Sequence, residues 1–246
     1  MTSLPWRVLV ALLLVTTTAG AGHAAELTKE QVEQIVREYL LKNPDVVTDA
    51  LRAAEAKRRE AQQQQTVQAI ATHREQLERD ATSPVRGHAA ADVTVVEFFD
   101  YACPHCKTAA AAVKDLLRDD PKVRLVYKEL PILGEGSMVA ARAALASRAQ
   151  GKYDAFHDAL MAAPGPPSEA SVMQAAAQVG LDVAKLKTDM ASPEITATIQ
   201  KNYALAQALG LSGTPAFVIG DEFAPGAVPL ARLKMMVAKA RQQKKP

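Results

Sequence analysis

The sequence predicts an α/β domain that carries an inserted helical region and is preceded by N-terminal helices. A β-branched and aromatic run at 93–99 is followed by a helical segment at 104–118 and a second strand pattern at 123–127. An alanine-rich stretch then extends over about 137–210, and short strand patterns return only after it. The order strand, helix, strand predicts a parallel strand pair joined by a right-handed crossover.

The first 25 residues have the pattern of a secretory signal peptide. Arg7 precedes an unbroken apolar run from Val8 to Val15, and small residues follow as far as Ala25. This run is much shorter than the roughly 20 apolar residues that a membrane-spanning helix needs. We therefore expect residues 1–25 to be removed and the mature protein to act outside the cytoplasm.

The composition excludes some classes of protein. The 246 residues include 29 basic and 27 acidic side chains, for a net charge of +2. Such a balance does not favour binding to nucleic acid. The chain is long enough to bury a sizeable core without a disulfide framework. Its 2 cysteines, Cys103 and Cys106, therefore indicate redox chemistry or metal binding.

Residues 26–82 are predicted to form a helical region ahead of the domain. Thr28 and Gln31 have the spacing of a capping box, and Asn43-Pro44 ends the first helix and starts a second. Helical spacing gives the first helix a complete apolar face, which consists of Val32, Ile35, Val36, Tyr39 and Leu40.

Two interpretations of this helical region stay open. Residues 57–65 are polar on every side, which is typical of a solvated helical linker. The complete apolar face of the first helix favours an oligomerisation stalk, because a second copy of the chain would bury that face most simply. Of the two, we favour homo-oligomerisation through residues 26–82.

The domain begins with a strand that has apolar side chains on both faces, at residues 93–99, which is typical of a central strand. Glycine and proline breaks predict four or five helices within the insert. Short strands are expected at 216–219 and near Phe223, and a final helix from Pro229 to about Arg241.

Cys103 and Cys106 are spaced to form a redox-active disulfide. With two residues between them, they can close a small ring and reopen it by exchange with another thiol. A helix is expected from Pro104, which places Cys103 where unpaired amides and the helix dipole favour its thiolate. A protonated His105 adds to this effect. A stabilised thiolate makes the disulfide a strong oxidant.

The same cysteines allow other roles. A closed zinc site needs four ligands, and the sequence has no second cysteine pair. Cu(I) is the stronger alternative, because the thiolates of Cys103 and Cys106 with the nearby His105 suit this ion and need no further ligand. An inert structural disulfide would close too short a loop to add much stability.

Glu97 stands inside the otherwise apolar strand at 93–99. An unpaired carboxylate is expensive to bury, so its presence indicates a purpose. A buried acid beneath the cysteine pair, with a raised pKa, would accept and return the proton of Cys106 during exchange. The alternative is an ordinary carboxylate that reaches solvent at the end of the strand.

Thr214-Pro215 directly precedes a predicted short strand, where a trans proline would fit poorly. The sequence therefore favours a cis peptide bond there. A loop with this bond would lie beside the cysteines and expose the backbone of Thr214 to an extended substrate.

Together these motifs resemble the DsbA family of thioredoxin-fold proteins. The resemblance rests on Glu97-Phe98-Phe99, Cys103-Pro104-His105-Cys106 and Gly213-Thr214-Pro215, and it covers residues 83–246. The N-terminal region, with Tyr39-Leu40-Leu41 and Asn43-Pro44-Asp45-Val46-Val47, is similar to the ScsC and Com1-like subgroup.

The resemblance implies a thioredoxin fold and a role for each residue that matches a family motif. Cys103 would be the attacking or attacked sulfur, Cys106 the resolving thiol, Glu97 the buried acid and Pro215 the cis-proline. It implies no cofactor beyond the redox-active disulfide.

The resemblance also implies the location, the substrates and the partners of the protein. It indicates a periplasmic location, extracytoplasmic protein substrates with thiols or disulfides, a membrane redox partner, and assembly through the N-terminal helices. The direction of exchange stays open. Pro104-His105 resembles strongly oxidising relatives, whereas Thr214 and the stalk resemble isomerases such as DsbC and DsbG.

Overall fold

The computed structural model describes residues 27–88 and 90–243. The predicted signal peptide, residues 1–25, lies outside this described part of the chain. The chain divides into two compact units, with the boundary between Ala56 and Lys57. No helix in the described ranges combines the length and the apolar character needed to cross a membrane.

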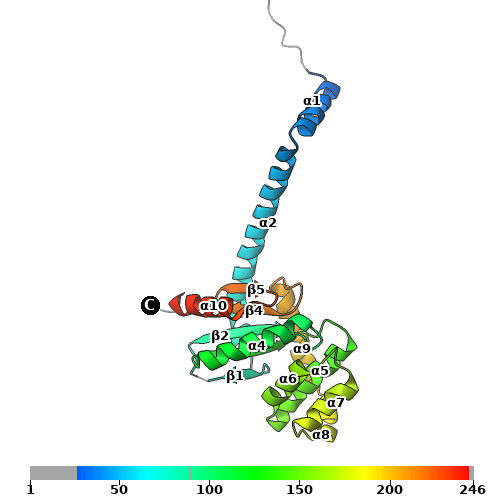
Figure 1. Ribbon diagram of the computed structural model, residues 1–246, viewed down its shortest axis with the longest axis vertical. Helices are drawn as coiled ribbons and strands as arrows, with labels where there is room; N and C mark the ends of the chain where they lie inside the picture. The colour runs from blue at the N-terminus through cyan, green and yellow to red at the C-terminus, as the bar shows by residue number, and fades with distance from the viewer. Residues whose placement is uncertain (1–26, 89, 244–246) are drawn as a thin grey trace, which may run out of the picture. The chain divides into compact units, whose positions relative to one another are not determined.

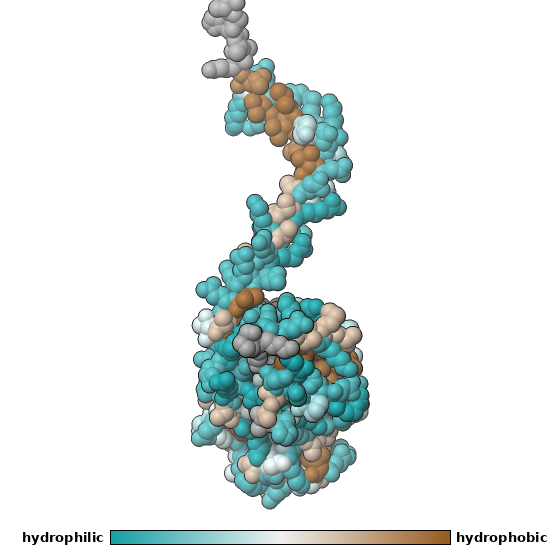
Figure 2. All heavy atoms as spheres, turned by 90° about the vertical axis from the view of Figure 1, so that its left-hand side faces the viewer, coloured by the Kyte–Doolittle hydropathy of each residue, from teal (hydrophilic) through white to brown (hydrophobic). Residues whose placement is uncertain are grey.

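The first unit contains α1 (Lys29–Lys42) and the beginning of α2 (Pro44–Thr72). The capping box is confirmed: Gln31 N–H donates to Thr28 Oγ1 at 3.3 Å, and Thr28 N–H donates to Gln31 Oε1 at 3.0 Å. None of the residues of α1, all of which are described, is buried. Its apolar face is therefore open to solvent in a single chain, and Figure 2 shows it as a brown stripe.

The second unit is built on a five-stranded sheet with the order β1-β3-β2-β4-β5 (Figure 1). The predicted parallel pair is present as β2 (Val93–Phe99) and β3 (Val123–Glu129). The other pairings, with β1 (Val85–Gly87), β4 (Ala216–Ile219) and β5 (Glu222–Pro225), are antiparallel. Every residue of β2 is buried, as expected for a central strand.

Strand β1 was not predicted. It has only three residues and pairs with the outer side of β3, so it shows no alternating pattern that a sequence reveals. Gly87 ends it with a φ of 106°, where a Cβ would lie 2.8 Å from the carbonyl oxygen of Val123. Glycine is the residue that fits this close approach to β3.

Helices cover both faces of the sheet. Helices α4 (Pro104–Asp119) and α10 (Leu230–Gln243) pack with Val95 and Phe99 of β2 in one buried cluster. On the opposite face, α9 (Pro193–Ala208) contributes to a second cluster with Val96 and Phe98. Residues alternate between the two faces along β2, as the pleat of a strand requires.

The predicted helical insert lies between β3 and β4. It contains five α-helices within residues 135–208, all of which are described. These are α5 (Glu135–Ser147), α6 (Tyr153–Ala162), α7 (Glu169–Gln178), α8 (Val183–Asp189) and α9, with a 3₁₀ turn η1 (Arg148–Gln150) after α5. Figure 1 shows α5 to α8 gathered beside the sheet.

The buried core of the second unit includes residues that precede Ser83, the predicted start of the globular domain. Ile70, near the end of α2, and Leu77, in α3 (Arg74–Glu78), are buried against Val96 and Phe98 of the sheet. The compact unit accordingly begins at Lys57. The two buried residues are separated by polar ones and form no continuous stripe, which is why the sequence does not place them in the core.

Candidate redox site

The predicted cysteine pair lies at the beginning of α4. Cys103 is the N-cap of this helix and Pro104 its first residue, as the sequence predicts. Proline is well suited to this position, because the first amide of a helix has no partner within the helix. Both cysteines are buried and are free thiols in this structure, whereas Pro104 and His105 are exposed.

The loop before β4 reaches the first cysteine. The peptide bond between Thr214 and Pro215 is cis, which confirms the prediction. The thiol of Cys103 donates a hydrogen bond to the carbonyl oxygen of Thr214, with an Sγ to O distance of 3.2 Å. Residues more than a hundred positions apart in the sequence thus meet at one sulfur atom.

Cys106 lies deeper than Cys103. It has no exposed surface, and its Sγ accepts a long hydrogen bond of 3.5 Å from the backbone N–H of Asp100. Burial raises the pKa of the Cys106 thiol well above its ordinary value, because the thiolate would lose its hydration. Cys106 therefore holds its proton more tightly than a solvent-exposed thiol does.

Glu97 is buried on β2, as predicted. It lies on the same face of the sheet as Val95 and Phe99, which share a cluster with both cysteines. Its Oε1 has no hydrogen-bond partner, and burial raises the pKa of Glu97 to about 8. The alternative of a solvent-exposed carboxylate is therefore wrong, and the side chain is mainly protonated at neutral pH.

A group of buried polar side chains on the same face of the sheet was not predicted. Tyr101 Oη and His157 Nδ1 are 3.0 Å apart, and Tyr153 Oη donates to Glu129 Oε1 at 2.5 Å. Burial lowers the pKa of His157 to about 3 and raises that of Glu129 to about 7. Both groups are thus mainly neutral at pH 6, so the core beneath α4 carries little net charge.

Asp100 was also missed, although it lies three residues before Cys103. It is buried, and its carboxylate accepts hydrogen bonds from backbone N–H groups of Ala102, Ile132 and Leu133. Ile132 and Leu133 belong to the loop after β3. An acidic residue three positions before the cysteine pair is the only local signal of this arrangement, and it does not reveal the distant partners.

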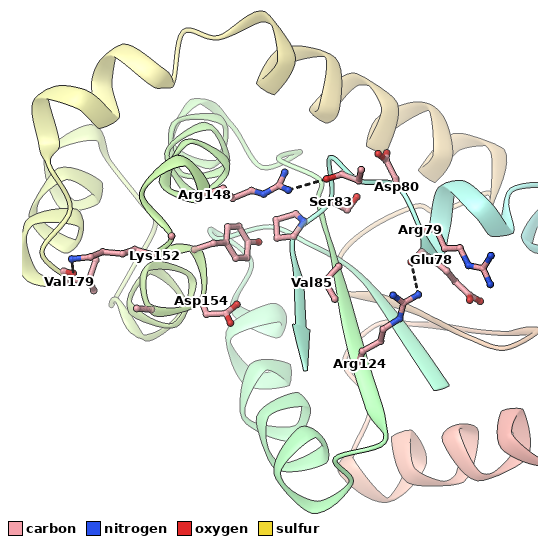
Figure 3. Close-up of a pocket in the computed structure, with 15 residues that line it drawn as sticks. Glu78, Arg79, Asp80, Ser83, Val85, Arg124, Arg148, Lys152, Asp154 and Val179 are labelled. Atoms are coloured by element: carbon pink, nitrogen blue, oxygen red, sulfur yellow. Dashed lines mark hydrogen bonds between the residues drawn. The ribbon is translucent and has the colours of Figure 1, made fainter. Parts of the chain in front are cut away.

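A separate cavity of about 830 Å³ is lined by Ser83, Pro84 and Val85 at the start of β1 (Figure 3), and neither cysteine is among its lining residues. Among the cations that line it, Arg124 donates to the Glu78 carbonyl oxygen at 2.9 Å and Arg148 to the Ala81 carbonyl oxygen at 3.0 Å. These bonds fasten the segment before β1 to the domain. In the described residues, no group of three or more His, Cys, Asp or Glu side chains is placed to hold a metal ion.

The fold and the site together define a class of protein. A thioredoxin-type sheet that places a Cys-x-x-Cys pair at a helix N-terminus, next to a cis-proline loop, is the arrangement of a thiol-disulfide oxidoreductase. The chain belongs to the family described as DSBA-like thioredoxin domain, whose model matches residues 94–238. The model described as Copper resistance protein ScsC N-terminal domain matches residues 29–61.

The solved structures that are similar to this chain include a thioredoxin-like oxidoreductase and an ScsC protein. A thioredoxin-like oxidoreductase from Silicibacter pomeroyi DSS-3 is 54% identical, with a TM-score of 0.68, and the match covers 69% of this chain and 98% of that one. ScsC from Proteus mirabilis, in a transitional conformation, is 32% identical, with a TM-score of 0.68. The match covers 87% of this chain and 97% of that one.

A curated relative is much longer than this chain. The Na(+)/H(+) antiporter NhaA 1 of Salinispora arenicola is 33% identical over 158 residues, which are 63% of this chain and 24% of the antiporter. The chain thus spans about a quarter of the length of that relative, and the similarity concerns one part of it.

Proposed function

We propose that the protein is a periplasmic thiol-disulfide oxidoreductase that exchanges disulfides with the thiols of secreted proteins. The observation that carries this proposal is the contact between the Cys103 thiol, at the start of α4, and the carbonyl oxygen of Thr214 beside the cis-proline. The apolar leader pattern at residues 1–25 supports the location.

The exchange proceeds through a mixed disulfide. In the oxidised protein, a substrate thiolate attacks Sγ of Cys103 and displaces Sγ of Cys106 as a thiolate. A second substrate thiolate then attacks the substrate sulfur of the mixed disulfide and displaces Cys103. The substrate leaves as a disulfide, and the protein keeps the two electrons as its dithiol. A membrane redox partner would take up these electrons and restore the Cys103–Cys106 disulfide.

Glu97 acts as the proton donor to the displaced Cys106. A Cys106 thiolate is unfavourable in its buried position, so it takes up a proton as it leaves the disulfide. Glu97 is protonated at neutral pH and lies on the sheet face that carries the cysteine cluster. It returns to the acid form when the disulfide is made again.

Substrate binding follows from the groups around Cys103. The backbone of Thr214 lies at the Cys103 thiol, where it offers hydrogen bonds to an extended polypeptide. The side chains of Ile132 and Leu133, which are 40% and 53% exposed, supply an apolar contact. These groups suit an unfolded segment better than a folded surface.

Replacement of Cys106 by Ala tests the proposal. Without the resolving thiol, the mixed disulfide between Cys103 and a substrate persists, so the C106A protein is expected to carry covalently bound proteins that dithiothreitol releases. The matched control is C103A, which lacks the attacked sulfur and should trap none. A folded C106A protein that traps nothing in periplasm would reject the proposal.

The direction of exchange is measured with ribonuclease. Oxidation of reduced ribonuclease reports oxidase activity, and recovery of activity from scrambled ribonuclease reports isomerase activity. We expect isomerase activity if the protein is oligomeric, because several sites then face one substrate. Fast oxidation by a monomer that does not unscramble would identify an oxidase instead.

Copper binding is the second candidate function. The match of residues 29–61 to the N-terminal domain of a copper resistance protein favours it, and the thiols of Cys103 and Cys106 near His105 suit Cu(I). Titration with Cu(I) against a competing chelator tests this role. Tight stoichiometric copper with negligible dithiol exchange would replace the oxidoreductase proposal.

A further inference from the structure

Asp100 occupies the junction between β2 and the turn that leads into Cys103. It is only 1% exposed, and a buried carboxylate is unfavourable unless hydrogen bonds replace its hydration. Its Oδ1 accepts the N–H of Ala102 at 2.7 Å. Its Oδ2 accepts the N–H groups of Ile132 at 2.8 Å and Leu133 at 3.0 Å. The two oxygens therefore bind two different segments of the chain.

The backbone of Asp100 contacts both cysteines. Its N–H points at Sγ of Cys106 at 3.5 Å, and its carbonyl oxygen accepts the N–H of Cys103 at 3.1 Å. Asp100 is thus linked to the redox pair through its backbone and to the loop after β3 through its side chain. The carboxylate thus holds this loop next to the turn that carries the cysteines.

Two further hydrogen bonds hold the beginning of this loop, and the exposed part that follows is held by Asp100. Leu130 N–H donates to the carbonyl oxygen of Phe99 at 2.8 Å, and the Tyr203 hydroxyl donates to the Pro131 carbonyl oxygen. The apolar side chains that point to solvent come next, at Ile132 and Leu133. Hydrogen bonds to a carboxylate are stronger than those between neutral groups, so the Asp100 side chain binds these two amides tightly.

We propose that Asp100 is a positioning residue, whose carboxylate holds the Ile132–Leu133 loop at a fixed place beside Cys103 so that an apolar substrate segment on the loop presents its sulfur to the thiol. This inference rests on the proposed oxidoreductase function and assigns the role to a carboxylate whose hydrogen bonds all go to backbone N–H groups and not to a sulfur atom. Its effect is on the binding of polypeptides and not on thiol chemistry itself.

Replacement of Asp100 by Ser separates the hydrogen bond to Ala102 from the hydrogen bonds to the loop. A serine hydroxyl can still accept the N–H of Ala102 in a local turn, but it is too short to reach Ile132 and Leu133. For D100S we expect the KM for reduced ribonuclease to rise about tenfold, with kcat and the exchange rate with glutathione within about twofold of wild type. Amide hydrogen exchange at Ile132 and Leu133 should accelerate.

Two further variants keep the experiment decisive. D100N keeps the size of the side chain and one acceptor oxygen, so it should fold even if D100S does not, with a smaller rise in KM. The matched control is D120S: Asp120 also accepts an N–H two residues ahead, from Lys122 at 3.1 Å, but it lies at the other end of α4. D120S should leave the KM unchanged.

The outcomes separate this inference from the proposed function. An unchanged KM in D100S with accelerated exchange at Ile132 and Leu133 would overturn the role of Asp100. An equal loss of ribonuclease and glutathione exchange would show a general structural effect and also overturn it. If the wild-type protein shows no thiol-disulfide exchange with ribonuclease or with glutathione, the proposed function fails. The inference that rests on it then fails as well.

Discussion

At the scale of single residues, Glu97 shows how burial changes an acid. The strand around it is fully buried, and Oε1 has no hydrogen-bond partner, so the charged form of the carboxyl has nothing to replace water. The pKa of Glu97 rises from 4.5 to about 8 as a result. Between these pH values the folded protein holds a proton at Glu97 that the unfolded chain has lost. The free energy of unfolding therefore decreases as the pH rises from 4.5 to 8.

The E97Q variant is expected to remove this dependence. At pH 8 it should be more stable than wild type, by on the order of a few kcal/mol, whereas near pH 4.5 the two should be equal, because Gln resembles the protonated acid. Disulfide exchange should become slower, because Cys106 loses its proton donor. Urea unfolding and stopped-flow exchange across this pH range measure both effects.

The control for this experiment is E75Q, which changes an exposed carboxyl of α3. It should leave the stability profile and the exchange rate unaltered. Parallel pH profiles of stability for wild type and E97Q would show that Glu97 ionises normally. Exchange at wild-type speed in E97Q would show that the proton of Cys106 takes another route.

At the scale of elements, the segment from the end of α2 through α3 belongs to the core of the domain. Leu77 of α3 and Ile70 of α2 pack against the sheet face that Val96 and Phe98 present. Arg74 of α3 also forms an ion pair with Asp221 in the turn between β4 and β5. A protein that starts at Ser83 would leave the part of this sheet face that Ile70 and Leu77 cover open to water.

Replacement of Leu77 by Ala should therefore destabilise the domain by about 2–5 kcal/mol, the usual range for a buried leucine. The control is M235A in α10, where the side chain is 58% exposed, and its change should stay within about 0.5 kcal/mol. Thermal unfolding followed by circular dichroism measures both. A loss for L77A no larger than that for M235A would place α3 outside the cooperative unit.

At the scale of the whole molecule, the exposed face of α1 indicates assembly of several chains. Val32, Ile35, Val36 and Tyr39 are all exposed, although they lie on one side of a helix. The face continues into α2 with Val46 and Val47. Monomeric proteins rarely expose so much contiguous apolar surface, and a second copy of the chain offers a matching one. We therefore propose that the protein forms a homo-oligomer through this apolar face.

The I35E variant should abolish this assembly, because it places a charge in the centre of the apolar face. The matched control is Q34E, which introduces the same charge one position away on the polar side and should stay oligomeric. Light scattering coupled to gel filtration gives the mass of each protein. A chain that begins at Lys57, where the compact unit starts, should also be monomeric. A monomeric wild-type protein would contradict the proposal.

Local patterns made much of the site predictable. The spacing of Cys103 and Cys106, the acid within an apolar strand and the proline before a short strand are each visible within a few residues. Asp100 and His157 could not be predicted in the same way, since their partners lie 32 and 56 positions away in the chain. Strand β1 was missed because three residues are too few to show a period.

The sequence by itself determined the order of the elements, the position of the cysteine pair at a helix N-terminus and the placement of Glu97 in a central strand, because each depends on neighbours along the chain. Only the tertiary structure decided that the Cys103 thiol meets Thr214, that Asp100 binds the loop at Ile132, and that Leu77 lies in the core. These contacts depend on how the sheet and its helices pack, which brings together segments that no local pattern relates.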